Sequence, residues 1–85
     1  MPLKLVYSRR ACRDIEALDG GVRARLKAAL ERLSQAPQIH AHKLRNPAMG
    51  TYKMRLGDYR VIFDIEGEDI VILRVGHRRD IYRRL

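Results

Sequence analysis

The chain has 85 residues, a hydrophobic fraction of 46% and a formal net charge of +8, from 18 Lys and Arg against 10 Asp and Glu. This length predicts a single domain over residues 1–85 with a modest core, and the hydrophobic fraction argues against disorder. A single cysteine, Cys12, excludes an internal disulfide framework, and no apolar run reaches the roughly 20 residues that span a bilayer. The amino terminus lacks a signal-peptide pattern, so we expect a cytoplasmic protein.

The first part of the chain predicts a short strand and two helices. Residues 3–7 alternate apolar and polar side chains, which is typical of a strand, and Ser8 offers an N-cap for the helix that follows. Asp19-Gly20-Gly21 is expected to end this first helix. A second helix runs through residues 22–33 and stops before Pro37. We expect Cys12 to have a packing role in the first helix.

The second helix has an apolar face and a cationic face. The apolar face carries Val22, Leu26, Ala29, Leu30 and Leu33. The other face carries Arg23, Arg25, Lys27 and Arg32. These cations are expected to be solvated, although antiparallel pairing of the two helices would make them a second surface for a polyanion.

The last part of the chain predicts a three-strand antiparallel meander. Residues 37–49 contain two prolines and two histidines with weak periodicity, which indicates a loop. Strands are expected at residues 51–56, 59–65 and 70–75, with Gly57-Asp58 as a tight turn. The predicted fold class is therefore α+β: a short N-terminal strand, two antiparallel helices and the meander, forming one sheet with helices on one face.

Period-two alternation predicts which side chains of the meander face the helices. The apolar face should lie under the helices. The opposite face is expected to carry Lys53, Arg55, Arg60 and Arg74, together with Ile62, Ile70 and Ile72. An exposed apolar strip beside a cationic row indicates a bound protein partner.

The positive charge comes from both halves of the chain, but cations cluster near its end, in residues 74–83 (RVGHRRDIYR). A sheet does not need such residues in order to fold, and cations at this density usually bind a polyanion. Most of the cations are Arg, which binds phosphate bidentately and stacks on bases. A single Arg is more often a solvated surface residue, but the cluster predicts RNA binding.

Residues 52–63 (YKMRLGDYRVIF) and 75–83 (VGHRRDIYR), in this order of elements, resemble the RelE-type toxins of bacterial and archaeal toxin–antitoxin pairs. The resemblance covers essentially the whole chain. It implies a compact toxin that enters the ribosomal A site, cleaves mRNA there and inhibits translation. It also implies a cognate antitoxin that holds the toxin inactive in a hetero-oligomer, and leaves open operator DNA binding through the antitoxin. No cofactor, metal or membrane is implied.

The resemblance also implies site residues, matched one at a time. Lys53 and Arg55 match the cationic pair on the second strand, Arg60 the Arg after the turn Tyr, Arg78 the Arg after the fourth strand, and Tyr82 the Tyr near the carboxyl end. Arg55 stands where the best-studied pattern has a second Lys, and the spacing from Arg78 to Tyr82 is shorter than in some members. The expected catalytic residues are Lys53, Arg60, Arg78 and Tyr82. The expected RNA-binding residues are Lys43, Arg45, Arg55, Arg74, His77 and Arg79.

RNA cleavage without a metal proceeds by attack of a 2′-hydroxyl on the adjacent phosphate. Arg60 and Arg78 are assigned to stabilising the charge of the transition state, which is often the main source of rate enhancement in an enzyme. Lys53 is assigned to proton transfer or phosphate positioning, and His77 is a candidate acid or base. Tyr82 could donate or accept a hydrogen bond, or stack on a base.

His40 and His42 are interpreted as polar loop residues, because no carboxylate or cysteine completes a metal-ligand set with them.

Three alternatives stay open. The ParE-like branch of the same fold inhibits DNA gyrase and would not need the cationic set. A nucleic-acid-binding module without catalysis would show a strongly salt-dependent affinity and no cleavage. A toxin that has lost its activity would serve only within a repressor complex with its antitoxin.

Overall fold

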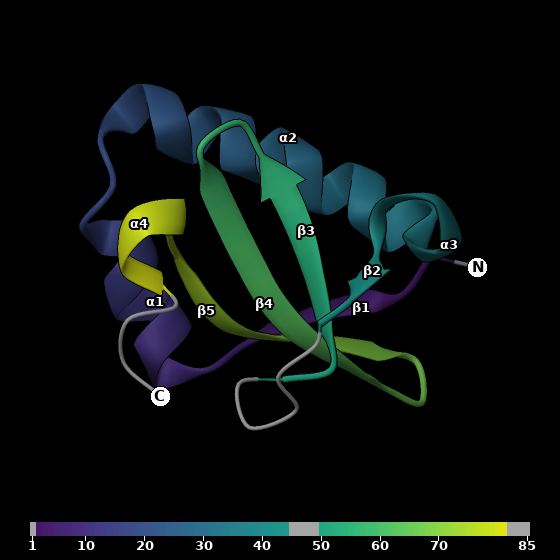
Figure 1. Ribbon diagram of the computed structural model, residues 1–85. Helices are drawn as coiled ribbons and strands as arrows, with labels where there is room; N and C mark the ends of the chain where they lie inside the picture. Colours follow the sequence, from purple (N-terminus) through teal and green to yellow (C-terminus); the bar gives the residue numbers. More distant parts are fainter. Residues whose placement is uncertain (1, 45–49, 82–85) are drawn as a thin grey trace.

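The computed structural model describes residues 2–44 and 50–81, which form one sheet with its two longest helices on one face (Figure 1). The elements are β1 (Lys4–Tyr7), α1 (Arg9–Glu16), α2 (Gly20–Gln35), α3 (Pro37–His40), β2 (His42–Lys43), β3 (Tyr52–Leu56), β4 (Tyr59–Glu66), β5 (Asp69–His77) and α4 (Arg78–Ile81). The strand order is β1-β5-β4-β3-β2, with β1 parallel to β5 and the other neighbours antiparallel. The predicted α+β class, with an N-terminal strand, two helices and a meander, is confirmed.

Both long helices begin at a side-chain cap. The Ser8 hydroxyl accepts a hydrogen bond from the Ala11 amide at 3.0 Å and donates one to the Leu73 carbonyl of β5, also at 3.0 Å. Asp19 caps α2 by accepting from the Val22 amide at 2.9 Å. The prediction that Asp19-Gly20-Gly21 ends the first helix was therefore wrong. The Asp19 carboxylate accepts from a free amide at the start of α2, and Gly20 and Gly21 are the first residues of that helix. The helix α1 had already ended at Glu16.

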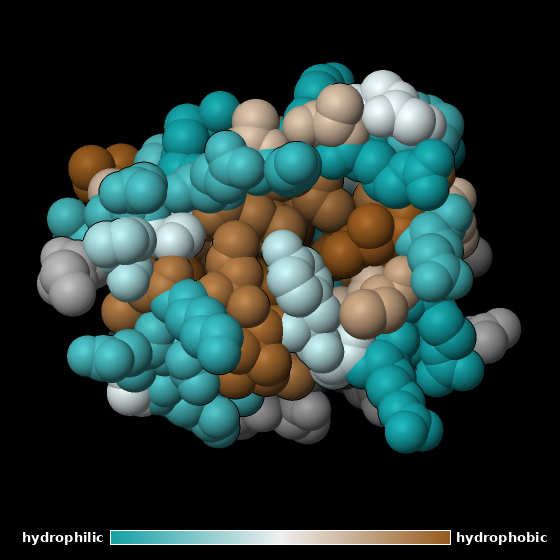
Figure 2. All heavy atoms as spheres, turned by 180° about the vertical axis from the view of Figure 1, so that it is seen from behind, coloured by the Kyte–Doolittle hydropathy of each residue, from teal (hydrophilic) through white to brown (hydrophobic). Residues whose placement is uncertain are grey.

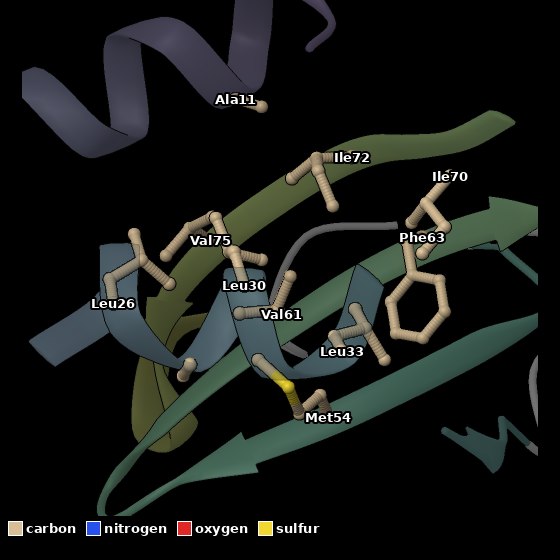
Figure 3. Close-up of a cluster of buried hydrophobic side chains, with 11 residues drawn as sticks. Ala11, Leu26, Leu30, Leu33, Met54, Val61, Phe63, Ile70, Ile72 and Val75 are labelled. Atoms are coloured by element: carbon tan, nitrogen blue, oxygen red, sulfur yellow. The ribbon is translucent and has the colours of Figure 1, made fainter. Parts of the chain in front are cut away.

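The core lies between α2 and the face of the sheet that the helices cover, and Ala11 of α1 adds to it on the side of β5 (Figure 3). Its buried members are Ala11, Leu26, Ala29, Leu30, Leu33, Met54, Val61, Phe63, Ile70, Ile72 and Val75. Tyr52 stacks on Phe63 with ring centroids 5.8 Å apart. The faces predicted for β3 and β4 are confirmed, since Met54, Val61 and Phe63 all belong to this core.

A β-bulge in β5 changes the predicted face of its first half. In the β4–β5 pair, Ile62 lies opposite Arg74 and Phe63 lies opposite Ile72, which leaves Leu73 as an extra residue. An extra residue interrupts the period-two alternation, so positions on both sides of a bulge can face the same way.

Ile70 and Ile72 were expected on the outer face of the sheet, and this prediction was wrong. Both are 0% exposed and belong to the core with Val75, which lies beyond the bulge. Alternation assigns a face correctly only while the register is continuous, and the sequence carries no mark of the interruption.

The outer face is covered by the chain itself near Gly50. A Cβ placed on Gly50 would lie 2.8 Å from Cγ2 of Ile62 and 3.0 Å from Cδ1 of Leu73, and the Thr51 amide donates to Oδ1 of Asp64 at 2.7 Å. Ile62 is consequently 0% exposed. The exposed apolar strip predicted for this face does not exist, and the protein partner inferred from that strip loses its support.

Replacing Gly50 with Ala is expected to lower the free energy of unfolding by about 1–3 kcal/mol, because the new methyl group overlaps Ile62 in a packed site. Urea unfolding measures the change. The matched control is Gly20→Ala, where a Cβ meets no heavy atom within 4 Å; its stability should stay constant or rise by up to about 1 kcal/mol. Equal effects at both positions would contradict the packing of Gly50 on the sheet.

The segment predicted as a loop contains structure. Residues 37–40 form α3, with Pro37 in its first turn, and residues 42–43 form β2, where His42 lies opposite Lys53. At the other end β5 continues to His77, and α4 follows it. Such short elements have too few residues for a periodic pattern. Arg45 and Tyr82 lie outside the described residues, as does the rest of 45–49 and 82–85. Among the described helices, none is both long and apolar enough to cross a bilayer.

Candidate functional site

The turn between β3 and β4 meets the start of α4. The Arg78 amide donates to the Asp58 carbonyl at 2.7 Å, and the Arg78 Nε atom lies 3.6 Å from Oδ1 of Asp58. Both side chains are more than half exposed, at 55% and 65%. The two segments that carried the family resemblance in sequence are therefore in contact in space, at one end of the sheet.

Arg60 is held against this turn by its guanidinium. Its Nη1 atom donates to the carbonyls of Gly57 and Tyr59 at 2.7 and 2.8 Å. In the β3–β4 ladder Arg60 lies directly opposite Arg55, and like charges at opposed positions destabilise a sheet. An anion bound between the two guanidinium groups would relieve that repulsion.

His77 is oriented by two neighbours. Its ring packs edge-on against Tyr59, with centroids 5.5 Å apart, and its Nδ1 atom accepts a hydrogen bond from the Arg79 amide at 3.1 Å. The neutral imidazole therefore carries its proton on Nε2, which becomes the atom that can donate to a substrate oxygen. Arg79 itself is exposed next to this ring.

The predicted lysines lie further along the sheet. Lys53 lies opposite Ile62 on β4 and opposite His42 on β2, and its side chain is half-buried on the outer face. Lys43 is exposed on β2, opposite Tyr52. Lys53 shares its face of β3 with Arg55, so their Cα atoms are about 7 Å apart along the strand at the usual strand rise.

Arg74 is engaged within the protein. Its Nε atom lies 3.0 Å from Oδ2 of Asp14 on α1, and its side chain is 24% exposed. The same carboxylate oxygen accepts a hydrogen bond from the Val75 amide at 3.0 Å. Pairing of β1 with β5 ends at Tyr7 and Ile72, so β1 offers no partner to this amide. Part of the positive charge of Arg74 is thus neutralised, whereas Arg55 has no ion pair with any described residue.

Four basic residues near the site were not predicted from the sequence. Nη2 of Arg25 is 3.9 Å from the position of a Cβ on Gly57, so this α2 side chain reaches the turn. Arg32, His40 and His42 line a hollow that they share with Arg55. Arg25 and Arg32 are seven residues apart and therefore lie on one face of α2, which is the signal that the sequence did offer.

A second concave surface lies on the helix side of the molecule. Figure 2 shows hydrophobic side chains in a hollow between hydrophilic rims. A groove of about 500 Å³ is lined by Tyr7, Cys12, Ile15, Glu16, Arg23, Leu26, Lys27 and Leu30. Cys12 was expected to pack in the first helix but is exposed in this groove, and Tyr7 is 41% exposed.

Comparison with known proteins gives consistent matches over nearly the whole chain. Residues 5–82 match the family described as the ParE toxin of type II toxin-antitoxin system, parDE. The toxin RelG of Mycobacterium tuberculosis H37Rv is 38% identical over 87 residues, which cover 99% of this chain and 100% of RelG. The mRNA interferase toxin RelE of Escherichia coli K12 is 32% identical over 77 residues, covering 87% of this chain and 81% of that toxin.

A similar fold is found in the crystal structure of the toxin–antitoxin complex RelBE2 from Mycobacterium tuberculosis. The TM-score is 0.80 at 32% sequence identity, and the match covers 92% of this chain and 100% of the other. The similarity of the fold therefore extends over most of this chain.

Proposed function

Since the chain belongs to the ParE toxin family of type II toxin–antitoxin systems, we propose that it is an endoribonuclease that cleaves mRNA on the ribosome and is neutralised by a cognate antitoxin. The resemblance to RelE-type toxins is confirmed by the curated relatives, which carry RelE and RelG names. The relative from Escherichia coli is named an mRNA interferase, which supports RNA cleavage. Several structural neighbours are complexes of toxin and antitoxin, which supports the partner. The proposed place of action is the cytoplasm, where ribosomes are.

The observation that carries the proposal is the contact between the β3–β4 turn and α4. This contact gathers Arg55, Arg60, His77, Arg78 and Arg79 at one end of the sheet. Asp58 is a weak partner for Arg78 at 3.6 Å, and both are exposed to water. A phosphate can displace this carboxylate, because an arginine binds phosphate through two parallel hydrogen bonds.

In the proposed reaction the 2′-oxygen of one nucleotide forms a bond to the adjacent phosphorus, and the bond from phosphorus to the 5′-oxygen breaks. The products are a 2′,3′-cyclic phosphate and a 5′-hydroxyl. Arg60 and Arg78 would stabilise the charge that develops on the phosphorane. Lys53 and His77 are the candidates for removing the proton of the 2′-hydroxyl and protonating the 5′-oxygen.

Dependence on the ribosome is implied by the resemblance to RelE-type toxins, and the residue types agree with it. The described part of the site offers arginines for charge, but no hydrogen bond joins a carboxylate to an imidazole for proton transfer there. Such a site gains most from a substrate that is already held in a reactive geometry, which can supply several orders of magnitude in rate. The ribosomal A site would provide that geometry.

A second candidate function is inhibition of DNA gyrase, favoured by the ParE description of the matching family. The relative named as an mRNA interferase and the clustered arginines favour RNA cleavage over it. A supercoiling assay with purified gyrase separates the two. Inhibition there, without mRNA cleavage, would replace the first proposal.

The test of the first proposal is a cell-free translation reaction in which mRNA 5′ ends are mapped with and without ribosomes. We expect cuts at codons in the A site only when ribosomes are present, and protection when the cognate antitoxin is added first. Intact mRNA during continued translation would overturn the proposal.

A further inference from the structure

We propose that the hollow at the free edge of β3 is a second phosphate-binding subsite, which holds the RNA backbone beside the scissile phosphate. The inference rests on the proposed RNA substrate. The hollow has a volume of about 200 Å³. Its basic lining, here called the edge basic cluster, consists of Arg32, His40, His42 and Arg55. The rest of the lining is Ala29, Ile39, Met54 and Leu56.

Four separate elements bring the edge basic cluster together. Arg32 comes from α2, His40 from α3, His42 from β2 and Arg55 from β3. The strand β2 has only two residues and pairs with β3 as far as Lys53. Beyond that point no described strand covers this edge of β3, so the edge stays open next to Arg55.

Among the described residues the hollow has no acidic lining, although Glu31 lines a neighbouring hollow with Arg32 and His40. No Asp or Glu is among the residues that line the hollow, and the ion pairs of the described chain involve Arg10, Arg74 and Arg78 but neither Arg32 nor Arg55. Cationic and imidazole groups that converge on one concave surface focus a positive potential there. An anion is therefore the expected ligand.

Phosphate fits this lining better than an isolated carboxylate would. The guanidinium groups can donate to the two non-bridging oxygens of a phosphodiester, and imidazole N–H groups can donate to lone pairs of the same oxygens. Ile39 is 66% exposed at the rim and offers an apolar contact for a ribose or base. Binding of a single carboxylate from a protein would not need two arginines and two histidines in the same hollow.

Arg55 links the hollow to the proposed cleavage site. It lines the hollow, and in the β3–β4 ladder it lies directly opposite Arg60. His42 lies opposite Lys53, the candidate for proton transfer. A strand of RNA whose scissile phosphate lies at Arg60 would thus place a neighbouring phosphate at the edge basic cluster.

The test uses the full chain and a hexanucleotide of 2′-O-methyl RNA, which lacks the attacking hydroxyl and stays intact. Affinity is measured by fluorescence anisotropy at several salt concentrations for Arg32→Gln and for Arg23→Gln. Both substitutions remove one exposed positive charge from α2, but Arg23 lines the apolar groove instead. Arg32→Gln should weaken binding roughly 3- to 10-fold and reduce the salt slope by about 0.7, whereas Arg23→Gln should change neither.

Nuclear magnetic resonance gives a second readout, in which the imidazole signals of His40 and His42 should shift on addition of the oligonucleotide. No shift, or equal losses of affinity in both variants, would overturn the subsite. Weaker binding of the antitoxin with unchanged RNA affinity in Arg32→Gln would also overturn it, in favour of a protein ligand. These measurements need no cleavage, so a failure of the proposed nuclease function would be seen separately in the translation assay.

Discussion

Arg60→Ala is expected to lower the rate of ribosome-dependent mRNA cleavage by about 10²- to 10³-fold, the effect of removing one preorganised donor to transition-state charge. The structure shows the preorganisation, since Nη1 of Arg60 is fixed by the carbonyls of Gly57 and Tyr59. A guanidinium that is already oriented does not have to be ordered when the phosphorane forms. Single-turnover cleavage of mRNA on purified ribosome complexes measures the change.

Two controls separate chemistry from folding. Arg9→Ala removes an exposed arginine from α1 and should leave cleavage unchanged. Arg60→Lys keeps the charge but loses the planar fork, so an intermediate rate is expected. Circular dichroism and antitoxin binding should be near normal in Arg60→Ala. Full cleavage activity in that variant would remove Arg60 from the catalytic residues.

The interior of the sheet was predictable where its register is continuous. Met54, Val61 and Phe63 were assigned to the core by alternation alone, and each is buried. Ile70 and Ile72 were assigned wrongly because the bulge at Leu73 is decided by packing and by the edge contacts of β5. The Ser8 hydroxyl, which donates to the Leu73 carbonyl, is one of those contacts, and it joins residues far apart in sequence.

The sequence predicted a cationic site, but it identified only some of the basic residues that lie there. The position of Arg60 after a turn could be read from local sequence, and the turn does hold its side chain. The approach of Arg25 to Gly57 and of Arg32 to Arg55 depends on where α2 crosses the sheet. The sequence shows that Arg25 and Arg32 share a face of α2, but it does not show where that face meets the sheet, so these arginines were expected to be solvated.

Arg74 has a structural contact that its charge did not reveal. RNA binding by Arg74 stays a prediction, and in the structure Arg74 is the ion-pair partner of Asp14. The carboxylate is needed there because β1 ends at Tyr7 and leaves the Val75 amide without a strand partner. Arg74 thus connects β5 to α1. The contribution of this ion pair to stability can be tested separately from any contact of Arg74 with RNA.

Asp14→Ala is accordingly expected to lower the free energy of unfolding by about 3 kcal/mol. The substitution leaves the Val75 amide without an acceptor and the partly buried Arg74 without its counter-ion, and orphaned groups of this kind cost about 1–3 kcal/mol each. For a domain of this size, whose total stability is roughly 4–13 kcal/mol, the loss would be large. Urea unfolding followed by circular dichroism measures it.

Asp14→Asn is the matched variant, because its side-chain oxygen can still accept from Val75 while the charge on Arg74 goes unpaired. It should lose about half as much stability as Asp14→Ala. Asp19→Ala removes an exposed cap, whose carboxylate accepts from the Val22 amide, and about 1 kcal/mol is expected there. If all three variants lose the same free energy of unfolding, the contacts of Asp14 with Arg74 and Val75 do not stabilise the packing of α1 on β5. The Ser8 contacts would then be the ones that connect the two elements.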